Sequence, residues 1–526
     1  MLELVSSETM QRLEKILSEK YGVDTLLLME NAGRGVAEEI IKVIQHYSFS
    51  KVYILCGVGN NGGDGLAIAR HLHLRFPSLS TVIYLLGKEE QLKKDAHFNY
   101  QVVKNLSIPV VEVSSSQEVD LEKGALLVDA LLGTGITREV EGIYKEVIEK
   151  INTSGDFVVA VDIPSGVEAS DGRIMGEAVK ADLTVTLGLI KRGLCSFPGR
   201  ECVGKLKLAN IGIPLPLEEA GLKADGFLIT PSMVRKMLPE RHWDTHKVSA
   251  GVLGVIAGSS SLLGAGLLVS LSGYRSGAGM VVWPLSSSLS PLVKLFIPEV
   301  VSVNLVSSGE WYYSLSHWKI IEKALEDRKC RALAVGPGIG TNPSTSLLLE
   351  KVVDSSFSGV IDADALNIIS QNRDNWKARL TNWVITPHPG EMARILGISV
   401  QEVNENRIAA SLKASSLLGC ITVLKGAGTV VASPQGEVFL NPTGSSVLAS
   451  AGSGDILTGI IAGFIAQGVN PLHSAISGVF LHGLAGELLE REGKKQILSR
   501  EIAEKLNEAR RMVENGEYTL SLLDGD

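Results

Sequence analysis

The sequence NPTGSSVLASAGSGDILTGIIAGF, residues Asn441 to Phe464, joins a loop of small residues to an apolar run with helical spacing that begins at Ile456. Glycines let the backbone curl, and the first amides of a helix have no partners inside it, so they point outward. Such a helix start favours a phosphate. Asp455 stands at this point. It either caps the helix or takes a proton from a hydroxyl that attacks or leaves with a phosphoryl group.

Length and composition indicate a soluble protein of several domains. At 526 residues the chain exceeds one ordinary core, which predicts two or three domains. Apolar residues make up 45% and charged residues 21%, as in globular proteins. The net charge is −8 and no basic block occurs, which argues against nucleic acid as a partner.

The termini and cysteines indicate a cytoplasmic protein. The N-terminus MLELVSSETMQ lacks the basic and apolar regions of a signal peptide. No apolar stretch approaches the ~20 residues of a membrane span, so no membrane association is expected. The cysteines are scattered, odd in number and free of CxxC pairs, which is typical of reduced thiols rather than disulfides or zinc ligands; they are Cys56, Cys195, Cys202, Cys330 and Cys420.

The first half of the chain alternates strands and helices after two expected helices within residues 9–46. Lys51–Cys56 is expected to be a strand that runs into the glycine-rich loop Gly57–Gly65, with a helix beginning near Leu66. Further strands are expected at Thr81–Leu86, Pro109–Val113, Ala125–Ala130, Phe157–Ile163 and Leu183–Leu187. This alternation predicts a mainly parallel sheet covered by helices on both faces.

Polar side chains follow three of these strands, and the carboxyl ends of parallel strands meet at one edge of a sheet. Asn61, Asp129 and Ser165 offer hard oxygen ligands suited to an alkali or alkaline-earth cation. Asp64 and Asp162 could serve as acid or base. An aspartate at a strand end is often only a turn former, but three such ends together favour a binding site. The first loop reads GVGNNGGDG, which is not the dinucleotide fingerprint GxGxxG.

The second half is expected to be another α/β domain after a linker. Around residues 214–226 the apolar periodicity lapses and prolines, glycines and charges accumulate. A helix is expected at Gly264–Gly277, with strands at Val252–Ala257, Met280–Trp283, Ala332–Val335, Gly359–Ile361, Trp383–Ile385 and Ile421–Leu424. Several of these strands are followed by short glycine-rich or polar sequences, here called tips, of the kind found at functional sites. Among them are GPGIG, DADALN, TPHPGE and KGAGT. These tips predict a single active edge that faces the Gly454 loop.

Each tip residue also has a structural interpretation. Asp362 and Asp364 could cap the following helix, and His388 between prolines could be only a rigid turn residue. Glu391 could cap a helix or order water on a magnesium ion. Lys425 and the residues after it offer a cation and backbone amides to phosphates, although the Walker spacing GxxxxGK[ST] is absent.

The motifs LMENAG, GVGNNGGDG, VDALLGTGI and VDIPSG resemble the NAD(P)H-hydrate epimerase domain over roughly residues 1–215. That family has a Rossmann-like fold, interconverts the two epimers of hydrated NAD(P)H and binds potassium. The resemblance implies that Asn61, Asp129 and Ser165 hold potassium, with Asp162 favoured as the acid–base group. It also implies substrate contacts from Asn60, Asn61, Gly62, Gly63, Asp64, Gly133, Thr134, Gly135, Ile136, Thr137, Arg138, Glu139, Tyr144 and Asp162.

The motifs GSSSLLGA, GPGIG, DADALN, TPHPGEM, LKGAGT and NPTGSSVLASAGSGDILTGIIAG resemble the ribokinase-like superfamily, and within it the ADP-dependent NAD(P)H-hydrate dehydratases, over about residues 225–515. The resemblance implies substrate contacts from Ala265, Gly338, His388 and Asp455. It implies nucleotide contacts from Lys425, Gly426, Ala427, Gly428, Thr429 and Gly454. Gly264–Ala265 follows two leucines, where relatives tend to have an aromatic–threonine pair.

Together the resemblances imply a bifunctional metabolite-repair enzyme. A Rossmann-like epimerase domain (1–217), a linker (218–226) and a ribokinase-like dehydratase domain (227–518) would restore both hydrate epimers to NAD(P)H at the expense of ADP, with potassium and magnesium. Relatives assemble as dimers through the first half and as higher oligomers through the second, so a homo-oligomer is expected. Two alternatives stay open: a small-molecule kinase, because GSGD also serves such enzymes, and a non-enzymatic scaffold.

Overall fold

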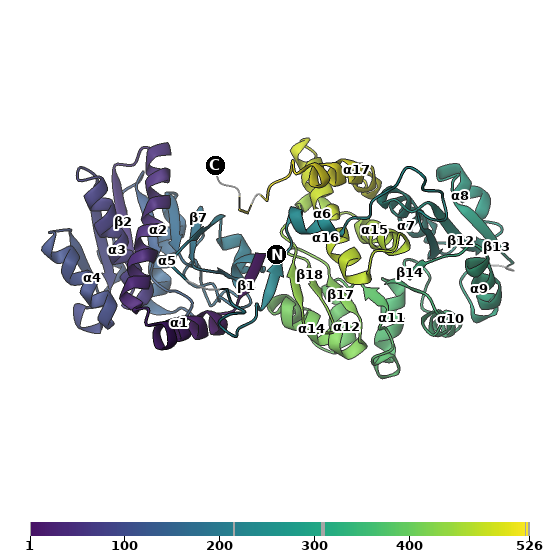
Figure 1. The fold of residues 1–526 in the computed structure, drawn as a ribbon, viewed down its shortest axis with the longest axis horizontal. Coiled ribbons are helices and arrows are strands. Elements are labelled where there is room, and N and C mark those ends of the chain that lie inside the picture. Colours follow the sequence, from purple (N-terminus) through teal and green to yellow (C-terminus); the bar gives the residue numbers. More distant parts are fainter. Residues whose placement is uncertain (1, 214–215, 307–310, 521, 524–526) are drawn as a thin grey trace. The chain divides into compact units, whose positions relative to one another are not determined.

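The computed structural model describes residues 2–213, 216–306, 311–520 and 522–523 (Figure 1). The chain divides into two compact units, one of residues 2–227 and one of residues 228–520. Leu522 returns to the first unit, where its carbonyl accepts a hydrogen bond of 2.8 Å from the Leu206 amide.

The first unit is built on a sheet of seven strands in the order β4-β3-β2-β5-β6-β7-β9. All neighbouring pairs are parallel, as predicted. The strands are β2 (Lys51–Cys56), β3 (Ser80–Leu86), β4 (Val110–Val113), β5 (Leu126–Ala130), β6 (Phe157–Val161), β7 (Leu183–Leu187) and β9 (Lys205–Ala209). A short parallel pair, β1 (Leu2–Val5) with β8 (Ile190–Lys191), lies apart from this sheet.

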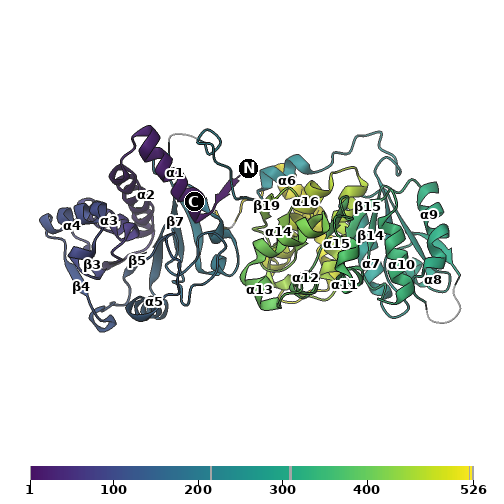
Figure 2. The same cartoon turned by 90° about the horizontal axis from the view of Figure 1, so that it is seen from below.

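Helices cover both faces of this sheet, and β2 shows why. Val52, Ile54 and Cys56 belong to one hydrophobic core, whereas Tyr53 and Leu55 belong to another. Successive side chains of a strand point to opposite faces, so both faces of β2 are buried. The first core lies under α1 (Ser7–Tyr21), α2 (Thr25–His46), α3 (Asn60–Arg75) and α4 (Lys94–Asn105), and the second under α5 (Gly142–Ser154). Figure 2 shows α2 and α3 on the side of the strands opposite α5.

Helix α3 begins at Asn60, so the predicted start near Leu66 was wrong. The sequence NNGGDG forms the first turns of this helix rather than a loop before it. Glycine allows this because the helix enters close to the preceding backbone: a Cβ atom on Gly62 would lie 1.8 Å from the Gly57 carbonyl oxygen. Asn60, Asn61 and Asp64 are therefore held on a rigid helical turn at the end of β2.

The second unit has a sheet whose consecutive strands run β13-β12-β11-β14-β15-β16-β17-β18-β19. Pairing is parallel from β13 to β17 and antiparallel from β17 to β19. The strands are β11 (Val252–Ile256), β12 (Met280–Ser286), β13 (Val301–Leu305), β14 (Ala332–Val335), β15 (Ser358–Ile361), β16 (Trp383–Ile385), β17 (Ile421–Leu424), β18 (Val430–Ala432) and β19 (Val438–Leu440), with β10 (Gly226–Leu228) at the unit boundary.

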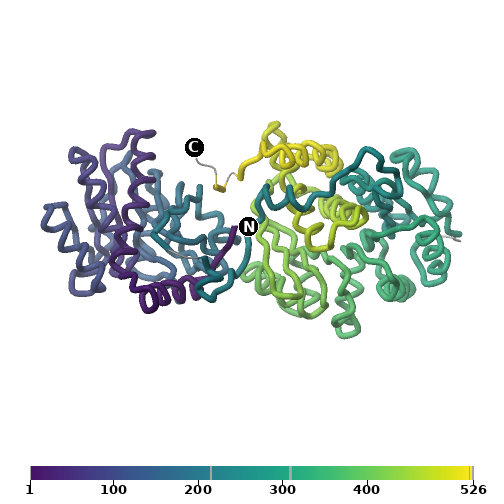
Figure 3. The backbone as a smooth tube through the Cα atoms, viewed as in Figure 1, coloured from purple at the N-terminus to yellow at the C-terminus, as the bar shows by residue number. Residues whose placement is uncertain are grey.

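Helices of this unit come from distant parts of the sequence. They are α6 (Pro231–Met237), α7 (Leu263–Ser276), α8 (Ser290–Phe296), α9 (Trp318–Asp327), α10 (Pro343–Val353), α11 (Asp364–Gln371), α12 (Pro389–Leu396), α13 (Val400–Glu405), α14 (Arg407–Leu418), α15 (Ser453–Ala466), α16 (Pro471–Arg491) and α17 (Ser499–Asn515). Figure 3 shows the late helices α16 and α17 beside the early helices α6 and α7, in agreement with their contacts. Both units are therefore mainly parallel α/β structures.

Helix α15 begins at Ser453, three residues before the start of the apolar run expected at Ile456. Gly452 precedes it with φ +88°, a left-handed conformation that glycine adopts readily. Asp455 consequently lies in the first turn of the helix. Small residues then let α15 approach α7: a Cβ atom on Gly459 would lie 2.0 Å from Ser272 Oγ, and one on Gly463 would lie 1.9 Å from Ser276 Oγ.

The five cysteines are buried and unpaired with one another, as expected for reduced thiols. Of the helices in the described residues, none combines the length and the apolar character needed to cross a membrane.

Candidate active sites

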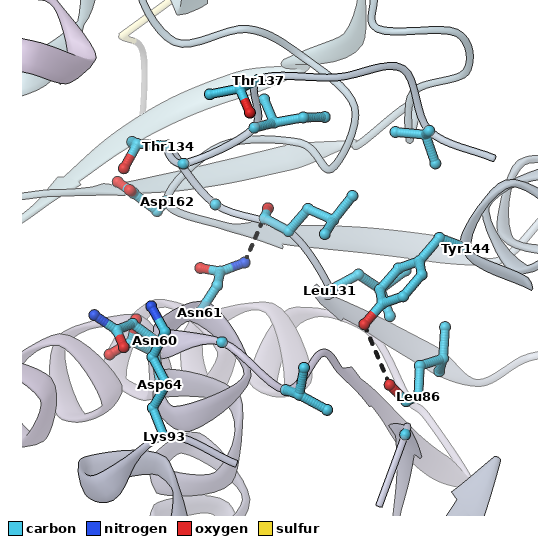
Figure 4. Close-up of a pocket in the computed structure, with 18 of the residues that line it drawn as sticks. Asn60, Asn61, Asp64, Leu86, Lys93, Leu131, Thr134, Thr137, Tyr144 and Asp162 are labelled. Carbon is cyan, nitrogen blue, oxygen red and sulfur yellow. Dashed lines mark hydrogen bonds between the residues drawn. The ribbon is translucent and has the colours of Figure 1, made fainter. Parts of the chain in front are cut away.

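The first unit contains a cavity of about 1780 Å³ at the carboxyl ends of β2, β5 and β6, closed from the other side by α1 and α2. In Figure 4, Asn60, Asn61 and Asp64 approach it from α3, whereas Thr134, Thr137 and Asp162 approach it from the strand ends. It is lined by the predicted substrate residues Asn60, Asn61, Asp64, Gly133, Thr134, Gly135, Ile136, Thr137, Arg138, Glu139, Tyr144 and Asp162. Gly62 and Gly63 lie in the first turn of α3 but are not in the lining, because Gly62 faces Gly57 and Gly63 faces Met29.

The predicted cation ligands meet beneath the cavity. Asp129 Oδ1 accepts hydrogen bonds from the Ser165 hydroxyl at 2.6 Å and from the Leu131 amide at 3.2 Å, and Oδ2 accepts one from the Ser165 amide at 2.8 Å. The Leu132 backbone connects this group to Asn61: its amide donates to Ser165 Oγ at 2.8 Å, and its carbonyl accepts from Asn61 Nδ2 at 3.2 Å. The three side chains thus surround one turn of backbone.

This group fits a hard monovalent cation. Asp129 is 0% exposed, and burial raises its pKa to about 6 against hydrogen bonds from Ser165 and Leu131 that lower it. A buried carboxylate is more stable as the anion beside a cation. Because Asn61 donates through Nδ2, its amide oxygen is not used in that hydrogen bond and is of a type that suits such a cation. Across the described residues, no three His, Cys, Asp or Glu side chains are arranged to hold a metal ion by themselves.

Asp162 directly follows β6; its backbone is strained and its carboxylate is held by hydrogen bonds. Its backbone has φ +66°, a region that non-glycine residues occupy at a cost of order 1–3 kcal/mol and that is common at functional sites. Its Oδ1 atom accepts hydrogen bonds from the Thr186 hydroxyl at 3.2 Å, from the Leu187 amide at 3.0 Å and from the Lys191 ammonium. The carboxylate is thus fixed at the wall of the cavity.

Among the lining residues that were not predicted from the sequence are Glu14 on α1 and Lys191 on β8. Lys191 comes four residues after the end of β7, so the strand-end signal could have found it. Glu14 lies among charged residues of an amphipathic helix, which gives no sequence signal. Burial raises the pKa of Glu14, with the Asp162 carboxylate as the second cause. Burial likewise raises the pKa of Asp64 well above its usual range, followed by the charges of Asp162 and Glu14.

Tyr144 lines the same cavity from α5. Its hydroxyl donates a hydrogen bond of 3.2 Å to the Leu86 carbonyl at the end of β3 (Figure 4). Burial raises the pKa of this phenol, so it is neutral at physiological pH and can offer a ring face and a hydroxyl to a ligand.

In the second unit, Asp362 joins three elements at the end of β15. Its carboxylate is 1% exposed; Oδ1 accepts from the Lys425 ammonium at 2.8 Å, and Oδ2 accepts from the Thr458 hydroxyl at 2.7 Å. Lys425 follows β17 and Thr458 lies on α15. The two hydrogen bonds to Asp362 therefore hold the start of the turn after β17 against α15. Asp362 therefore does not act as a simple helix cap.

Asp455 faces this ion pair from the first turn of α15. Burial, followed by the Asp362 charge, raises its pKa to about 7, while the Lys425 charge opposes both. Burial acts to lower the pKa of Lys425, but Asp362 and Glu391 outweigh it and the net pKa is raised. A Cβ atom on Gly454 would lie 3.2 Å from Lys425 Nζ, so glycine lets the ammonium lie against the loop. Asp455 is thus a carboxyl able to gain or lose a proton near neutral pH.

His388 and Glu391 cap the N-terminus of α12 reciprocally. His388 Nδ1 accepts from the Gly390 amide at 2.9 Å, and Glu391 Oε2 accepts from the His388 amide at 2.8 Å. Burial, followed by the Lys425 and Arg394 charges, lowers the pKa of His388, while burial raises that of Glu391 to about 7. The imidazole is therefore neutral and offers Nε2–H to a ligand, while the structural role foreseen for both residues is also present.

The remaining predicted residues of this unit fall into two groups. Ala265, near the start of α7, adjoins Gly338: a Cβ atom on Gly338 would lie 3.3 Å from Ala265 Cβ. Lys425, Gly426, Ala427, Gly428 and Thr429 form the turn between β17 and β18, with φ +128° at Gly426 and +59° at Gly428.

Arg407 supports this turn from below and was not predicted. Its guanidinium donates to the carbonyls of Leu424 at 3.1 Å and Lys425 at 2.9 Å. It lies at the start of α14, far from any strand-end motif, so the sequence offered no signal for it.

In comparisons with known proteins, two different family models match separate parts of the chain. A family model described as YjeF-related protein N-terminus matches residues 25–193, and one described as NAD(P)H-hydrate dehydratase matches residues 253–508. The chain is 35% identical over 504 residues to the bifunctional NAD(P)H-hydrate repair enzyme Nnr of Moorella thermoacetica, with 94% of each chain covered. It is 37% identical over 489 residues to the protein of that name from Thermofilum pendens, with 91% of this chain and 90% of the relative covered.

Among solved structures, one similar protein is the ADP/ATP-dependent NAD(P)H-hydrate dehydratase from Bacillus subtilis, co-crystallised with ATP and Mg²⁺. It is 30% identical, with a TM-score of 0.46, and the match covers 55% of this chain and 99% of that chain.

Proposed function

Since this chain belongs to the family of bifunctional NAD(P)H-hydrate repair enzymes, we propose that its first unit epimerises hydrated NADH and NADPH and that its second unit dehydrates the S epimer with ADP. The observation that carries the proposal is the pairing of two separate sites, each with an aspartate: Asp162, held at the cavity wall of the first unit, and Asp455, buried beside Asp362 and Lys425 in the second.

Epimerisation at the first site requires a bond to the hydroxyl-bearing ring carbon to break and reform. That carbon also bears the ring nitrogen, so removal of the hydroxyl proton lets the carbon–nitrogen bond open to an aldehyde. Ring closure on the other face then gives the other epimer. Asp162 lies on the cavity wall with its carboxylate fixed by three donors, and we assign it the base role.

Potassium is the cation that we assign to Asn61, Asp129 and Ser165. When bound, it would supply a fixed positive charge next to the phosphate or carboxamide oxygens of the substrate. The chain's own contribution is the buried Asp129 carboxylate, whose hydrogen bonds to Ser165 and Leu131 fix the ligand geometry. Thr134 and Thr137 then offer hydroxyls to the substrate from the loop above.

At the second site we assign Asp455 the general base. It removes the proton from the substrate hydroxyl, whose oxygen attacks the terminal phosphoryl group of ADP and releases AMP. The ring nitrogen's lone pair then expels phosphate, and loss of a proton from the neighbouring ring carbon restores the double bond of NAD(P)H. Amides at the start of α15 stabilise charge on the phosphoryl oxygens, and the Lys425–Thr429 turn holds the nucleotide.

Ala265, Gly338 and His388 are assigned to the hydrated ring, with the neutral His388 donating from Nε2. Magnesium is the divalent ion expected with a nucleotide diphosphate, and Glu391 is the carboxyl placed to order its water. We further propose that the enzyme acts in the cytoplasm as a homo-oligomer, a dimer through the first unit and a higher oligomer through the second.

The test is the recovery of absorbance at 340 nm from a mixture of both hydrate epimers with purified protein, magnesium, potassium and ADP. Recovery of both epimers with one phosphate released per molecule supports both assignments. Recovery of one epimer alone contradicts the assignment of the first unit. Failure to recover either, with ADP or ATP consumed only when another alcohol is supplied, identifies a small-molecule kinase instead, and no reaction at all favours a scaffold.

A further inference from the structure

The first cavity holds an acidic group that none of the assigned roles uses. Glu14 lines it from α1, and Asp64 lines it from α3. Lys191 of β8 lies against Asp162. The charges of these four residues influence one another, although they come from four different parts of the chain. Further charged residues line the same cavity, namely Lys88, Lys93, Asp95, Arg138, Glu139 and Glu141.

The Lys191 ammonium is committed to protein partners. The lysine is 1% exposed, and its ammonium donates to Asp162 Oδ1, to the Leu187 carbonyl at 2.7 Å and to the Thr186 hydroxyl at 3.4 Å. An ammonium has three protons, and these partners use all of them. Lys191 therefore acts on a substrate only through Asp162, whose carboxylate it holds in place.

Among the described residues, no cation forms an ion pair with Glu14 as Lys191 does with Asp162. Glu14 is partly exposed, and burial together with the Asp162 charge raises the pKa of Glu14, while the Lys191 charge lowers it. Two nearby carboxyl groups do not both ionise readily, which favours the protonated form of Glu14. Asp162 and Glu14 are therefore placed as a base and an acid in one cavity.

We propose that Glu14 is the proton donor that works with Asp162 at this site, and that Lys191 is the positioning residue that keeps Asp162 as the base. The inference rests on the proposed epimerase function of the first unit.

The step balances with these two groups alone. Asp162 takes the hydroxyl proton as the carbon–nitrogen bond breaks and the aldehyde forms, while Glu14 gives its proton to the departing ring nitrogen. After rotation of the aldehyde, Glu14 takes that proton back as nitrogen attacks the other face, and Asp162 returns its proton to the oxygen. Both residues end the cycle as they began it.

Asp64 is the competing acid. It is 8% exposed and lies in the first turns of α3, where it is packed against the strand-end loops. Glu14 is more accessible, so it can approach a ring in the cavity and exchange its proton with solvent. This difference favours Glu14.

The experiment starts from the purified R epimer without ADP and follows formation of the S epimer by chromatography. Glu14→Gln should lower the rate by at least ~10²-fold, the usual worth of a positioned acid. Glu19→Gln, the same change at an exposed position of the same helix, should stay within about twofold of the wild type. Dehydration of the S epimer by the second unit should be unchanged in both variants.

The rate against pH tests Glu14, and two Lys191 variants test the positioning role. Glu14→Gln should abolish the fall in rate at high pH, because that fall reports loss of the Glu14 proton. Lys191→Met should lower kcat by about tenfold or more with KM within about twofold of the wild type, because the Asp162 carboxylate loses the ammonium that holds it in place. Lys191→Arg keeps the charge and should restore most of the rate, and it replaces Lys191→Met if that variant does not fold.

Three results overturn the inference. They are Glu14→Gln within about twofold of the wild type, Asp64→Asn losing all activity while Glu14→Gln keeps it, and Lys191→Met turning over at the wild-type rate. A wild-type chain that does not epimerise contradicts the proposed function instead, so the two failures are distinguishable.

Discussion

Asp455 shows how strongly the surroundings of one carboxyl decide its use. An exposed aspartate would be ionised at neutral pH and a weak base, whereas burial beside Asp362 raises the pKa of Asp455 to about 7. A base of that pKa accepts a proton effectively and still ionises in the cell. Lys425 opposes the shift, so the ion pair below the loop also adjusts the base above it.

We therefore expect dehydration of the S epimer to slow as pH falls through about 7, because only ionised Asp455 takes the hydroxyl proton. Asp455→Asn should lose at least ~10²-fold of the rate at every pH, while ADP binding measured by calorimetry changes little. Loss of binding and rate together would instead assign Asp455 a structural role.

Gly336 is a position where the backbone requires glycine. Its φ is +123°, and a Cβ atom would lie 1.9 Å from the Asp362 carbonyl oxygen. Gly336→Ala should lower the free energy of unfolding of the second unit by more than ~2 kcal/mol, since the Asp362 backbone must move. Chemical denaturation measures this.

Gly340→Ala is the matched control for Gly336→Ala. Its φ is +76°, but nothing lies within 4 Å of the added atom. The free energy of unfolding should therefore fall only by the cost of a left-handed alanine, about 1 kcal/mol. Equal losses in the two variants would contradict the steric explanation.

Helix α15 carries Asp455 and is positioned by its close packing on α7. Gly459→Ala places a methyl group 2.4 Å from the Val269 carbonyl oxygen as well as against Ser272 Oγ, so the helices must separate. We expect a loss of stability of more than ~1 kcal/mol and slower dehydration, although alanine is the better helix former. Epimerisation by the first unit should stay unchanged.

The control for Gly459→Ala is Gly264→Ala in α7, where nothing lies within 4 Å. That change should be neutral or stabilise by up to ~1 kcal/mol. Thermal unfolding of both variants decides whether packing or helix propensity dominates at Gly459.

The sequence predicted those strands in which an apolar run ends at a glycine or a polar residue. β2, β7, β14, β16 and β17 begin and end at the predicted residues. The sequence did not predict β9, β13, β18 or β19, because no functional tip marks these short strands. The start of α3 was placed six residues late because NNGGDG has the composition of a loop, and only the close approach to Gly57 explains its helical form.

The same distinction holds for the sites. Motif residues such as Asn60, Asp162 and Asp362 were predictable, since each stands at or close to the end of a buried strand. Glu14 and Arg407 were not, because each reaches its site from a helix whose sequence resembles an ordinary solvent-exposed surface. The Asp362–Thr458 hydrogen bond joins residues 96 positions apart, and such a pairing is decided by the tertiary fold.

The whole molecule contains two units with separate cores and separate sites. We expect Asp162→Asn to repair only the S epimer and Asp455→Asn to repair neither. An equal mixture of the two variants should repair both epimers, because the epimerised substrate can diffuse from one chain to the other. Absorbance at 340 nm measures each case, and a mixture that repairs only the S epimer would contradict independent units.

The burial of all five cysteines has a practical consequence for labelling. Burial raises the pKa of Cys195, Cys330 and Cys420 to about 12 and that of Cys202 to about 11, and it raises that of Cys56 further. Maleimides react with thiolates, so the folded chain should remain unmodified. A single cysteine introduced at exposed Glu19 would then be the sole attachment point for a fluorophore, and modification of the native thiols would report unfolding.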